Sequence, residues 1–429
     1  MTSNRFVTRS LSVRGVLVFG IAAGASGAIA CSSDSTTTKT TVTDGGPGTG
    51  GTANTGGGSS SGGSASGGKG GASTAGAGNS GGTAGAGGTA GSGGEGTDSG
   101  AAPVALVVKQ TNLVANLPNV APTVDSNLLN PWGLVPNPSG PFWVSDNHSG
   151  MATVYDPAGG PSKLNVKIPG PAGVDGGFTS SPTGQVFNGT AANFSGDKFI
   201  LDSEDGTISG WQGGATAVLR VDNSADSGYK GLALITNGTA GELVAANFHK
   251  GTVDVFDSTY KPVANPGFVD AGSPALPAGF AAFNVAALGG SVYISYAKQD
   301  PEKGDDTAGP GNGYVSVFKT DGTFQKRLVS GGALNSPWGL EIAPASFGAL
   351  AGTLLVGNFG NGAVHAYDVT TGELRGSLSD SKGPLIISGL WALVVGPKTT
   401  TTDFSSSVYF TAGPNGEDDG IFGKLEISK

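Results

Sequence analysis

The chain has 429 residues, of which 78 are glycine and only 13% are charged, and its formal net charge is −9. Glycine is thus more than twice as frequent as its usual share of about 7%. It shows no three-residue period, which excludes a collagen-like protein, and the single cysteine excludes a disulfide scaffold. The excess of acidic over basic residues does not favour the basic surface that nucleic acid needs, so we expect no nucleic-acid partner.

The N-terminus resembles a lipoprotein export signal. Arg5, Arg9 and Arg14 precede an apolar run that ends in Ala28-Ile29-Ala30-Cys31. A basic start, a short apolar core and small residues at the cut site are typical of a secretory signal, and the last four residues resemble the bacterial lipobox. We therefore predict that residues 1–30 are removed and that Cys31 is lipidated. The alternative is an ordinary secretory signal with an incidental cysteine.

Residues 31–102 are predicted to be a disordered tether. They hold 26 glycines and no Phe, Tyr or Trp, and consist mainly of Gly, Ser, Thr and Ala. Such a composition cannot bury enough apolar surface to offset chain entropy. A Gly-rich chain of this length spans about 45 Å. We expect an exported protein held in the cell envelope, at the outer membrane because Ser32 follows the cysteine, with membrane contact only through the lipid on Cys31.

Residues 103–429 contain an internal repeat. Pro131-Trp132-Gly133-Leu134 recurs as Pro337-Trp338-Gly339-Leu340 and, less closely, as Leu390-Trp391-Ala392-Leu393. The matching positions are 133, 184, 231, 285, 339 and 392, a period of about 50. Short alternating strands at that period predict an all-β fold, a six-bladed β-propeller, rather than a β-sandwich.

The segment 106–114 precedes the first repeat and has no partner of its own. The last copy has three clear strands, near 391–395, 408–412 and 421–427. Pairing 106–114 as the outer strand of the last blade would leave no open sheet edge. We therefore predict that this segment closes the ring, and that the protein is a monomer.

Polar turn residues after the second strands and at the inner-strand starts are expected to meet at one mouth of the central channel. Loop-borne polar groups on a rigid frame commonly carry function. The candidates for ligand binding are Asp146, Asn147, His148, Glu204, Asn247, His249, Gln299, Asn358 and Glu417.

Two interpretations of these residues stay open. Asn and Asp are favoured in such turns because their side chains bond the local backbone. The other interpretation is a ring of oxygen ligands suited to Ca²⁺, the one cofactor that the pattern suggests. That site would draw on Asp146, Asn147, Glu204, Asn247 and Asn358. His148 and His249 occupy matching turns and offer a transition-metal or acid–base pair as a further hypothesis.

Several longer motifs resemble an uncharacterised bacterial family of exported proteins, some of which carry a C-terminal PEP-CTERM sorting tail. They include N-P-W-G-L, G-P-F-W-V-S-D-N, A-A-N-F-H-K-G-T-V-D-V-F-D, G-G-A-L-N-S-P-W-G-L and Y-F-T-A-G-P-N-G-E-D-D-G-I-F-G, within residues 106–425. The resemblance implies an NHL-like six-bladed propeller in the cell envelope and implies no activity. This chain departs from the tailed members by ending in G-K-L-E-I-S-K.

Two functions follow as hypotheses. The first is a non-enzymatic envelope module that captures a protein or glycan, favoured by the tether and the low charge. The second is a divalent-metal-dependent hydrolase or lyase at the channel mouth, since the blades are distantly similar to gluconolactonase-type and streptogramin-lyase-type propellers. The motifs G-x-S-x-G and H-E-x-x-H are missing from residues 103–429, which disfavours nucleophile-elbow hydrolases and zincins.

Overall fold

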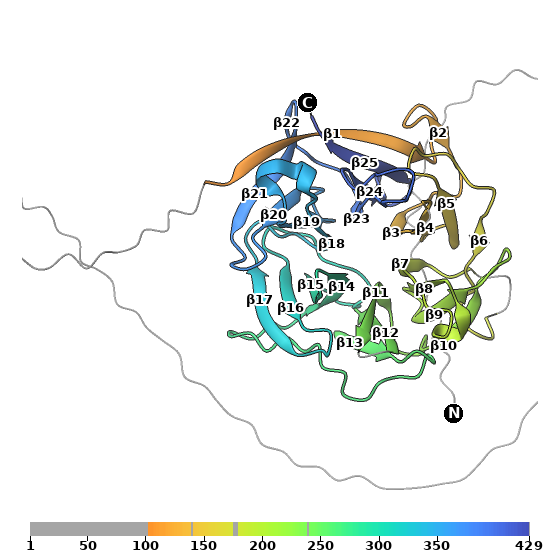
Figure 1. The fold of residues 1–429 in the computed structure, drawn as a ribbon. Coiled ribbons are helices and arrows are strands. Elements are labelled where there is room, and N and C mark those ends of the chain that lie inside the picture. Colours follow the sequence, from red (N-terminus) through yellow and green to blue (C-terminus); the bar gives the residue numbers. More distant parts are fainter. Residues whose placement is uncertain (1–101, 139, 175–178, 238–239, 429) are drawn as a thin grey trace, which may run out of the picture. The chain divides into compact units, whose positions relative to one another are not determined.

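The computed structural model describes residues 102–138, 140–174, 179–237 and 240–428. The predicted signal (1–30), the lipidation site Cys31 and nearly all of the predicted tether lie outside the described residues. The described part is almost entirely β-structure. Its strands form antiparallel groups arranged as a ring, a propeller-like architecture (Figure 1).

We name each strand group after its innermost strand. The β3 group holds β3 (Pro131–Pro136), β4 (Phe142–Asp146), β5 (Met151–Tyr155) and β6 (Val166–Lys167). The β7 group holds β7 (Pro182–Phe187), β8 (Phe199–Ser203), β9 (Thr207–Trp211) and β10 (Val218–Asp222), with the 3₁₀ turn η1 (Phe194–Gly196) between β7 and β8. The β11 group holds β11 (Tyr229–Asn237), β12 (Ala240–Asn247) and β13 (Thr252–Phe256).

The remaining groups follow the same order from the inside outwards. The β14 group holds β14 (Phe280–Leu288), β15 (Ser291–Lys298), β16 (Tyr314–Phe318) and β17 (Phe324–Ser330). The β18 group holds β18 (Pro337–Ile342), β19 (Leu354–Asn358), β20 (Val364–Tyr367) and β21 (Leu374–Asp380), with η2 (Ala345–Leu350) and the short β22 (Gly383–Pro384). The β23 group holds β23 (Leu390–Val395), β24 (Val408–Ala412) and β25 (Ile421–Ile427), and it is completed by β1 (Val104–Ala115), to which β2 (Thr123–Val124) is added.

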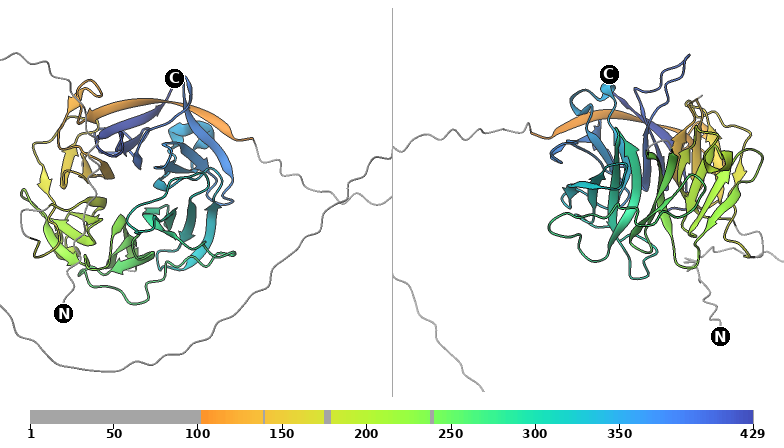
Figure 2. Two further views of the ribbon diagram at one scale, coloured as in Figure 1. Left: turned by 180° about the vertical axis from the view of Figure 1, so that it is seen from behind. Right: turned by 60° about the horizontal axis from the view of Figure 1, so that its bottom comes forward.

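The predicted ring closure is confirmed. Val108–Ala115 of β1 pair antiparallel with Ile421–Ile427 of β25. The same strand does more than was predicted, because its first residues, Val104–Val107, pair parallel with Gly376–Ser379 of β21. β1 therefore joins two neighbouring groups into one sheet, and Figure 2 shows it running along the outside of both.

Turn chemistry explains why the strands end where they do. The predicted turns between second and third strands contain a glycine with φ between 66° and 75°, at Gly150, Gly206, Gly251 and Gly362. Only glycine adopts this left-handed conformation without strain. Of the strands that follow, β5, β9 and β20 are mostly buried, whereas the first three residues of β13 are partly or fully exposed.

The inner strands of neighbouring groups approach one another so closely that there is no room for a Cβ at a second glycine position, inside these strands. A Cβ on Gly184 would lie 2.3 Å from the backbone nitrogen of Leu232, and one on Gly231 would lie 2.2 Å from the Asn284 side chain. The spacing analysis placed this repeat position at 285 in the fourth copy. The structure corrects it to Asn284, the residue after the aromatic Phe283, because Asn284 is the residue that lies against Gly231.

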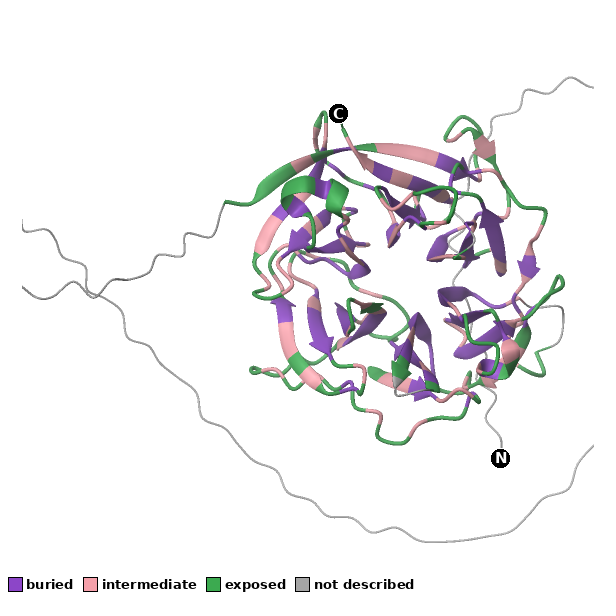
Figure 3. Cartoon of the chain, viewed as in Figure 1, coloured by how far each residue is buried: buried purple, intermediate pink, exposed green. Residues whose placement is uncertain are grey.

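Aromatic side chains fill one end of the central channel. Trp132 stacks on Trp391 with ring centroids 3.5 Å apart, and Trp338 meets Trp132 edge-on at 6.0 Å. All three indoles are buried, so they serve as packing between the groups. Burial is concentrated along the inner strands and exposure in the loops and outer strands (Figure 3).

Candidate functional site

The channel mouth is centred on a buried lysine that sequence analysis missed. Lys230, the second residue of β11, is ion-paired with Glu204 and with Asp305, whose carboxylate lies 2.9 Å from the ammonium nitrogen. The ammonium also lies 5.0 Å from the centre of the Trp132 ring. Burial opposes the charged form, but the two carboxylates outweigh it and raise the pKa of Lys230. The mouth thus holds a permanent cation supplied by the chain itself.

Two of the predicted residues belong to the cluster around this lysine: Glu204 contacts Lys230 directly, and Asn147 contacts Glu204. Glu204 accepts a hydrogen bond of 2.9 Å from the Asn147 side-chain amide, so both lie in the Lys230 cluster. His148 lies close enough to help lower the pKa of Asp305, which Lys230 lowers most. The prediction that these turns meet at one mouth therefore holds for residues of the β3 and β7 groups.

Glu417 is a carboxyl of the mouth whose pKa is strongly raised. Its side chain accepts a 2.7 Å hydrogen bond from Asn130, which in turn accepts one of 2.9 Å from the Trp391 indole. Burial raises the pKa of Glu417 to about 7, and the negative charges of Asp305 and Glu204 add to this effect. Glu417 is therefore about half protonated at neutral pH.

The turn amides Asn247 and Asn358 are used within the fold. The Asn247 amide donates to Asp254 at 2.8 Å and its oxygen accepts from the Lys250 backbone at 3.2 Å. Asn358 donates to the Ala333 carbonyl at 2.8 Å and accepts from the Asn335 backbone at 3.1 Å. Both agree with the turn-capping interpretation.

The other predicted residues have mainly structural contacts. Asp146 is fully buried, and burial raises the pKa of its carboxyl well above the ordinary range. Gln299 donates to the Phe248 carbonyl at 2.6 Å and ties two groups together. His249 is exposed, with Nδ1 3.2 Å from the Lys303 carbonyl.

The five residues considered for calcium are not drawn into one ligand set. Of these, only Asn147 and Glu204 are joined by a direct contact. Among the described residues, no group of three or more His, Cys, Asp or Glu side chains is placed to hold a metal ion. Calcium binding stays a prediction of the sequence.

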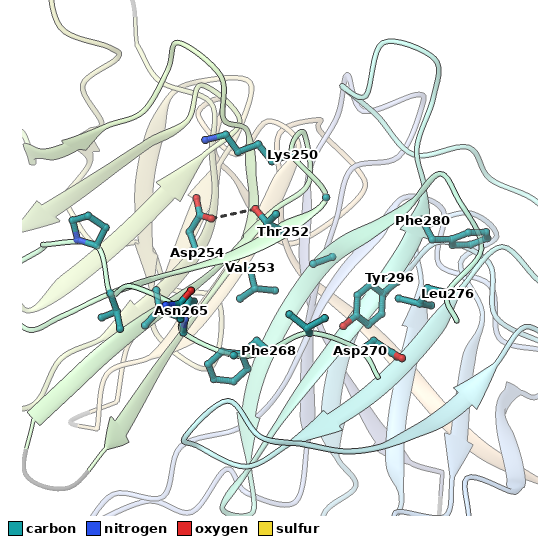
Figure 4. A pocket seen from close by; sticks show the side chains of 18 of the residues that line it. Lys250, Thr252, Val253, Asp254, Asn265, Phe268, Asp270, Leu276, Phe280 and Tyr296 are labelled. Carbon is teal, nitrogen blue, oxygen red and sulfur yellow. Dashed lines mark hydrogen bonds between the residues drawn. The ribbon is translucent and has the colours of Figure 1, made fainter. Parts of the chain in front are cut away.

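A second site lies away from the channel, beside β13. Here a groove of about 1210 Å³ opens between the β11 and β14 groups, under the segment 257–279. Its walls are mainly apolar and come from Val253, Val255, Phe268, Leu276, Phe280 and Tyr296. Figure 4 shows Val253 and Tyr296 on opposite sides of this groove.

Sequence analysis missed this groove, although one signal was present. After Phe256 the third repeat has no fourth strand pattern, and residues 257–279 instead carry Pro262, Pro266, Pro274 and Pro277. Proline cannot donate to a strand ladder. The shortage of strand residues in this copy was therefore the readable sign of an incomplete group.

No protein-family model matches the chain. No helix among the described residues is long and apolar enough to cross a membrane. Among solved structures, virginiamycin B lyase from Staphylococcus aureus is 11% identical with a TM-score of 0.41, covering 75% of this chain and 99% of its own. PQQ-bound aldose sugar dehydrogenase from Streptomyces coelicolor is 13% identical with a TM-score of 0.44, covering 76% and 100%.

Sequence relatives are closer, and they are viral. The uncharacterized protein L690 of Acanthamoeba polyphaga mimivirus is 32% identical over 339 residues, which are 74% of this chain and 85% of L690. The uncharacterized protein R648 of the same virus is 32% identical over 329 residues, 73% of this chain and 78% of R648. The resemblance to a bacterial exported family stays a prediction beside them. The chain belongs to the protein family represented by mimivirus L690 and R648.

Proposed function

We propose that this chain is a six-bladed β-propeller that works as a binding module and captures a protein or glycan. The observation that carries the proposal is the apolar groove beside β13. Concave, largely apolar recesses with a few polar groups are where proteins commonly bind ligands. The polar groups of the channel mouth, by contrast, are largely paired with one another around Lys230.

The binding role is tested with two probes on the full chain. One is a peptide of ten alternating threonine and valine residues with a lysine tail for solubility, and the other is an N-acetylglucosamine hexamer. Val269→Arg alters the groove rim, where Val269 is 72% exposed, and Val218→Arg on β10, 50% exposed, is the matched control. We expect calorimetry to show that at least one probe binds, at least tenfold more weakly to Val269→Arg. Binding of neither probe, or equal effects of both variants, would contradict the proposal.

The proposed location rests on the sequence. We propose that the module is exported and held at the cell envelope, at the outer membrane, by a lipid on Cys31 and a Gly/Ser/Thr/Ala-rich linker of residues 31–102. Cys31→Ala should release the protein from membranes. Unchanged partitioning of this variant into detergent would overturn the lipid anchor and leave the binding role untouched.

The metal-dependent alternative has a test of its own. Elemental analysis of the purified full chain measures bound divalent metal per molecule. A stoichiometric metal that is lost in Glu204→Gln would favour a hydrolase or lyase at the mouth, since Glu204 is the carboxylate shared by Asn147 and Lys230.

A further inference from the structure

We propose that the groove beside β13 binds an extended, uncharged polypeptide segment of a partner protein, which pairs with β13 as the missing outer strand. The inference rests on the proposed binding function and deepens it, because it chooses a polypeptide over a glycan. It starts from the one strand group that lacks a fourth strand.

The fold itself shows what occupies this position elsewhere. β5, β9, β16 and β20 each pair with a further strand, and β24 pairs with β25, which pairs with β1. β13 pairs with β12 alone among the described strands. The neighbouring groups thus provide the geometry for a strand beside β13, and β13 has an edge at which one is lacking.

The chain that follows β13 begins to cover this edge and then leaves it. The Val263 nitrogen donates to the Val255 carbonyl at 2.8 Å, so Val255 directs its backbone groups away from β12. Farther on, the Phe268 nitrogen donates to the Gly322 carbonyl at 2.8 Å, in the β16–β17 turn of the next group. Backbone direction alternates along a strand, so Val253 also directs its N–H and C=O outwards, where no described strand pairs with them.

An edge of unpaired backbone groups is a template for another strand. Recognition by strand addition combines main-chain hydrogen bonds, which give affinity, with pockets for alternate side chains, which give specificity. The groove supplies apolar surface for such side chains, because Val253 and Val255 line it together with Phe268, Leu276 and Tyr296. Its volume of about 1210 Å³ exceeds the roughly 300–1,000 Å³ of small-molecule sites.

A buried hydroxyl adds a second, independent observation. Tyr296 is 5% exposed, and its hydroxyl makes no hydrogen bond of normal geometry with the described residues. Burial and the nearby Asp270 carboxylate raise the pKa of this phenol, so it keeps its proton as a donor. In Figure 4 the hydroxyl points away from Leu276, toward the side of the groove where Val253 and Phe268 lie. A backbone carbonyl of the incoming strand is the acceptor that this donor lacks.

The charges along the groove explain why the segment is uncharged. Asp254 accepts hydrogen bonds from Tyr229 and Asn247, Asp270 is paired with Arg327, and Lys250 lies 2.9 Å from Asp226. Because both cations are already paired, an incoming negative charge would be desolvated without a free cation beside it. A glycan, whose many hydroxyls each need a partner, fits these apolar walls less well than alternating Val, Ile or Thr side chains.

The test uses the full chain and two forms of the threonine–valine peptide. One has ordinary amides, and the other carries N-methyl groups on alternate amides, which remove the hydrogen-bond donors of one edge. We expect the ordinary peptide to bind at least tenfold more tightly and to slow hydrogen exchange at Thr252–Phe256 at least tenfold. Tyr296→Phe should weaken its binding about threefold.

Each of the remaining outcomes would contradict a specific part of the proposal. Equal binding of the two peptides, or no slowing of exchange in β13, rejects strand addition. Binding of the N-acetylglucosamine hexamer, but not the peptide, in a manner sensitive to Val269→Arg also rejects it, while the proposed binding module stands. Slow hydrogen exchange in β13 without peptide, together with a dimer in size-exclusion chromatography, would show that a second copy of the chain pairs with the β13 edge. It would reject a separate partner protein.

Discussion

At the scale of single residues, Lys230 determines how the carboxylates of the channel mouth are paired. A buried lysine with carboxylates on two sides supplies the positive charge that a divalent ion would otherwise bring. The single positive charge of Lys230 balances only one of the two carboxylates, so Lys230, Glu204 and Asp305 together keep a net negative charge. The mouth is a set of paired side chains that holds the β7, β11 and β14 groups together.

Replacing Lys230 by methionine keeps most of the side-chain volume and removes the charge. Because the Glu204 and Asp305 side chains are 30% and 69% exposed, water screens them in part. We expect the free energy of unfolding to fall by about 1–3 kcal/mol, less than for a fully buried pair. Urea denaturation measures it, with the exposed Lys163→Met as control. Equal midpoints for the two variants would argue against the central role of Lys230.

Glu417 predicts a pH dependence of stability. Its pKa is raised to about 7 in the folded chain and is about 4.3 when unfolded. The folded state then binds more protons between these values, so the free energy of unfolding falls as the pH rises from about 4 to 7, by up to about 3 kcal/mol. Above pH 7 this contribution is lost.

Glu417→Gln removes the titrating group while keeping an acceptor for Asn130. The variant should lose this part of the pH slope and be more stable than the native chain at pH 8. Urea titrations between pH 4 and 8 measure the difference. A slope identical to that of the native chain would show that other groups cause it.

At the scale of elements, close contact between inner strands constrains the sequence most. Gly184→Ala would place a Cβ 2.3 Å from the Leu232 nitrogen, whereas Gly213→Ala meets nothing within 4 Å. The first clash is with backbone, which cannot rotate aside, so β7 and β11 must separate. We expect Gly184→Ala to lower the free energy of unfolding by about 2–3 kcal/mol and Gly213→Ala to change it by less than about 0.5 kcal/mol. Thermal or urea unfolding would reveal similar stabilities if the contact were unimportant.

Ring closure by β1 gives a second prediction at this scale. Val108 is 1% exposed in the contact with β25, whereas the adjacent Val107 is 42% exposed. A buried unpaired carboxylate in Val108→Asp should destabilise the protein by at least about 3 kcal/mol. Val107→Asp should have little effect on the melting temperature. A similarly small effect at both positions would mean that closure contributes little to stability.

At the scale of the whole molecule, the features that repeat along the chain could be predicted from the sequence, and the contacts that occur once could not. Turn glycines recur in four copies and tryptophan-glycine strand starts in two, and the period of these motifs revealed the strands and the partner of β1. Lys230 and Asp305 are 75 residues apart, and no local sequence pattern predicts that they form an ion pair. The fourth repeat position is Asn284, one residue before the position that the spacing indicated.

The candidate site shows the same division. Polar turn residues marked the channel mouth, but amide side chains such as Asn358 satisfy the backbone around them, which residue type alone cannot distinguish from ligand binding. The groove arises from a missing strand. It depends on where the segment 257–279 travels in space, and that course is set by contacts with the β14 group.

We propose that this molecule binds its partner beside β13 and not at the channel mouth. Calorimetric titration of the threonine–valine peptide into the native full chain, Val269→Arg and Glu417→Gln tests it most directly. We expect at least tenfold weaker binding for Val269→Arg and unchanged binding for Glu417→Gln. Unchanged binding for Val269→Arg together with a loss for Glu417→Gln would contradict it and move the binding site to the channel mouth.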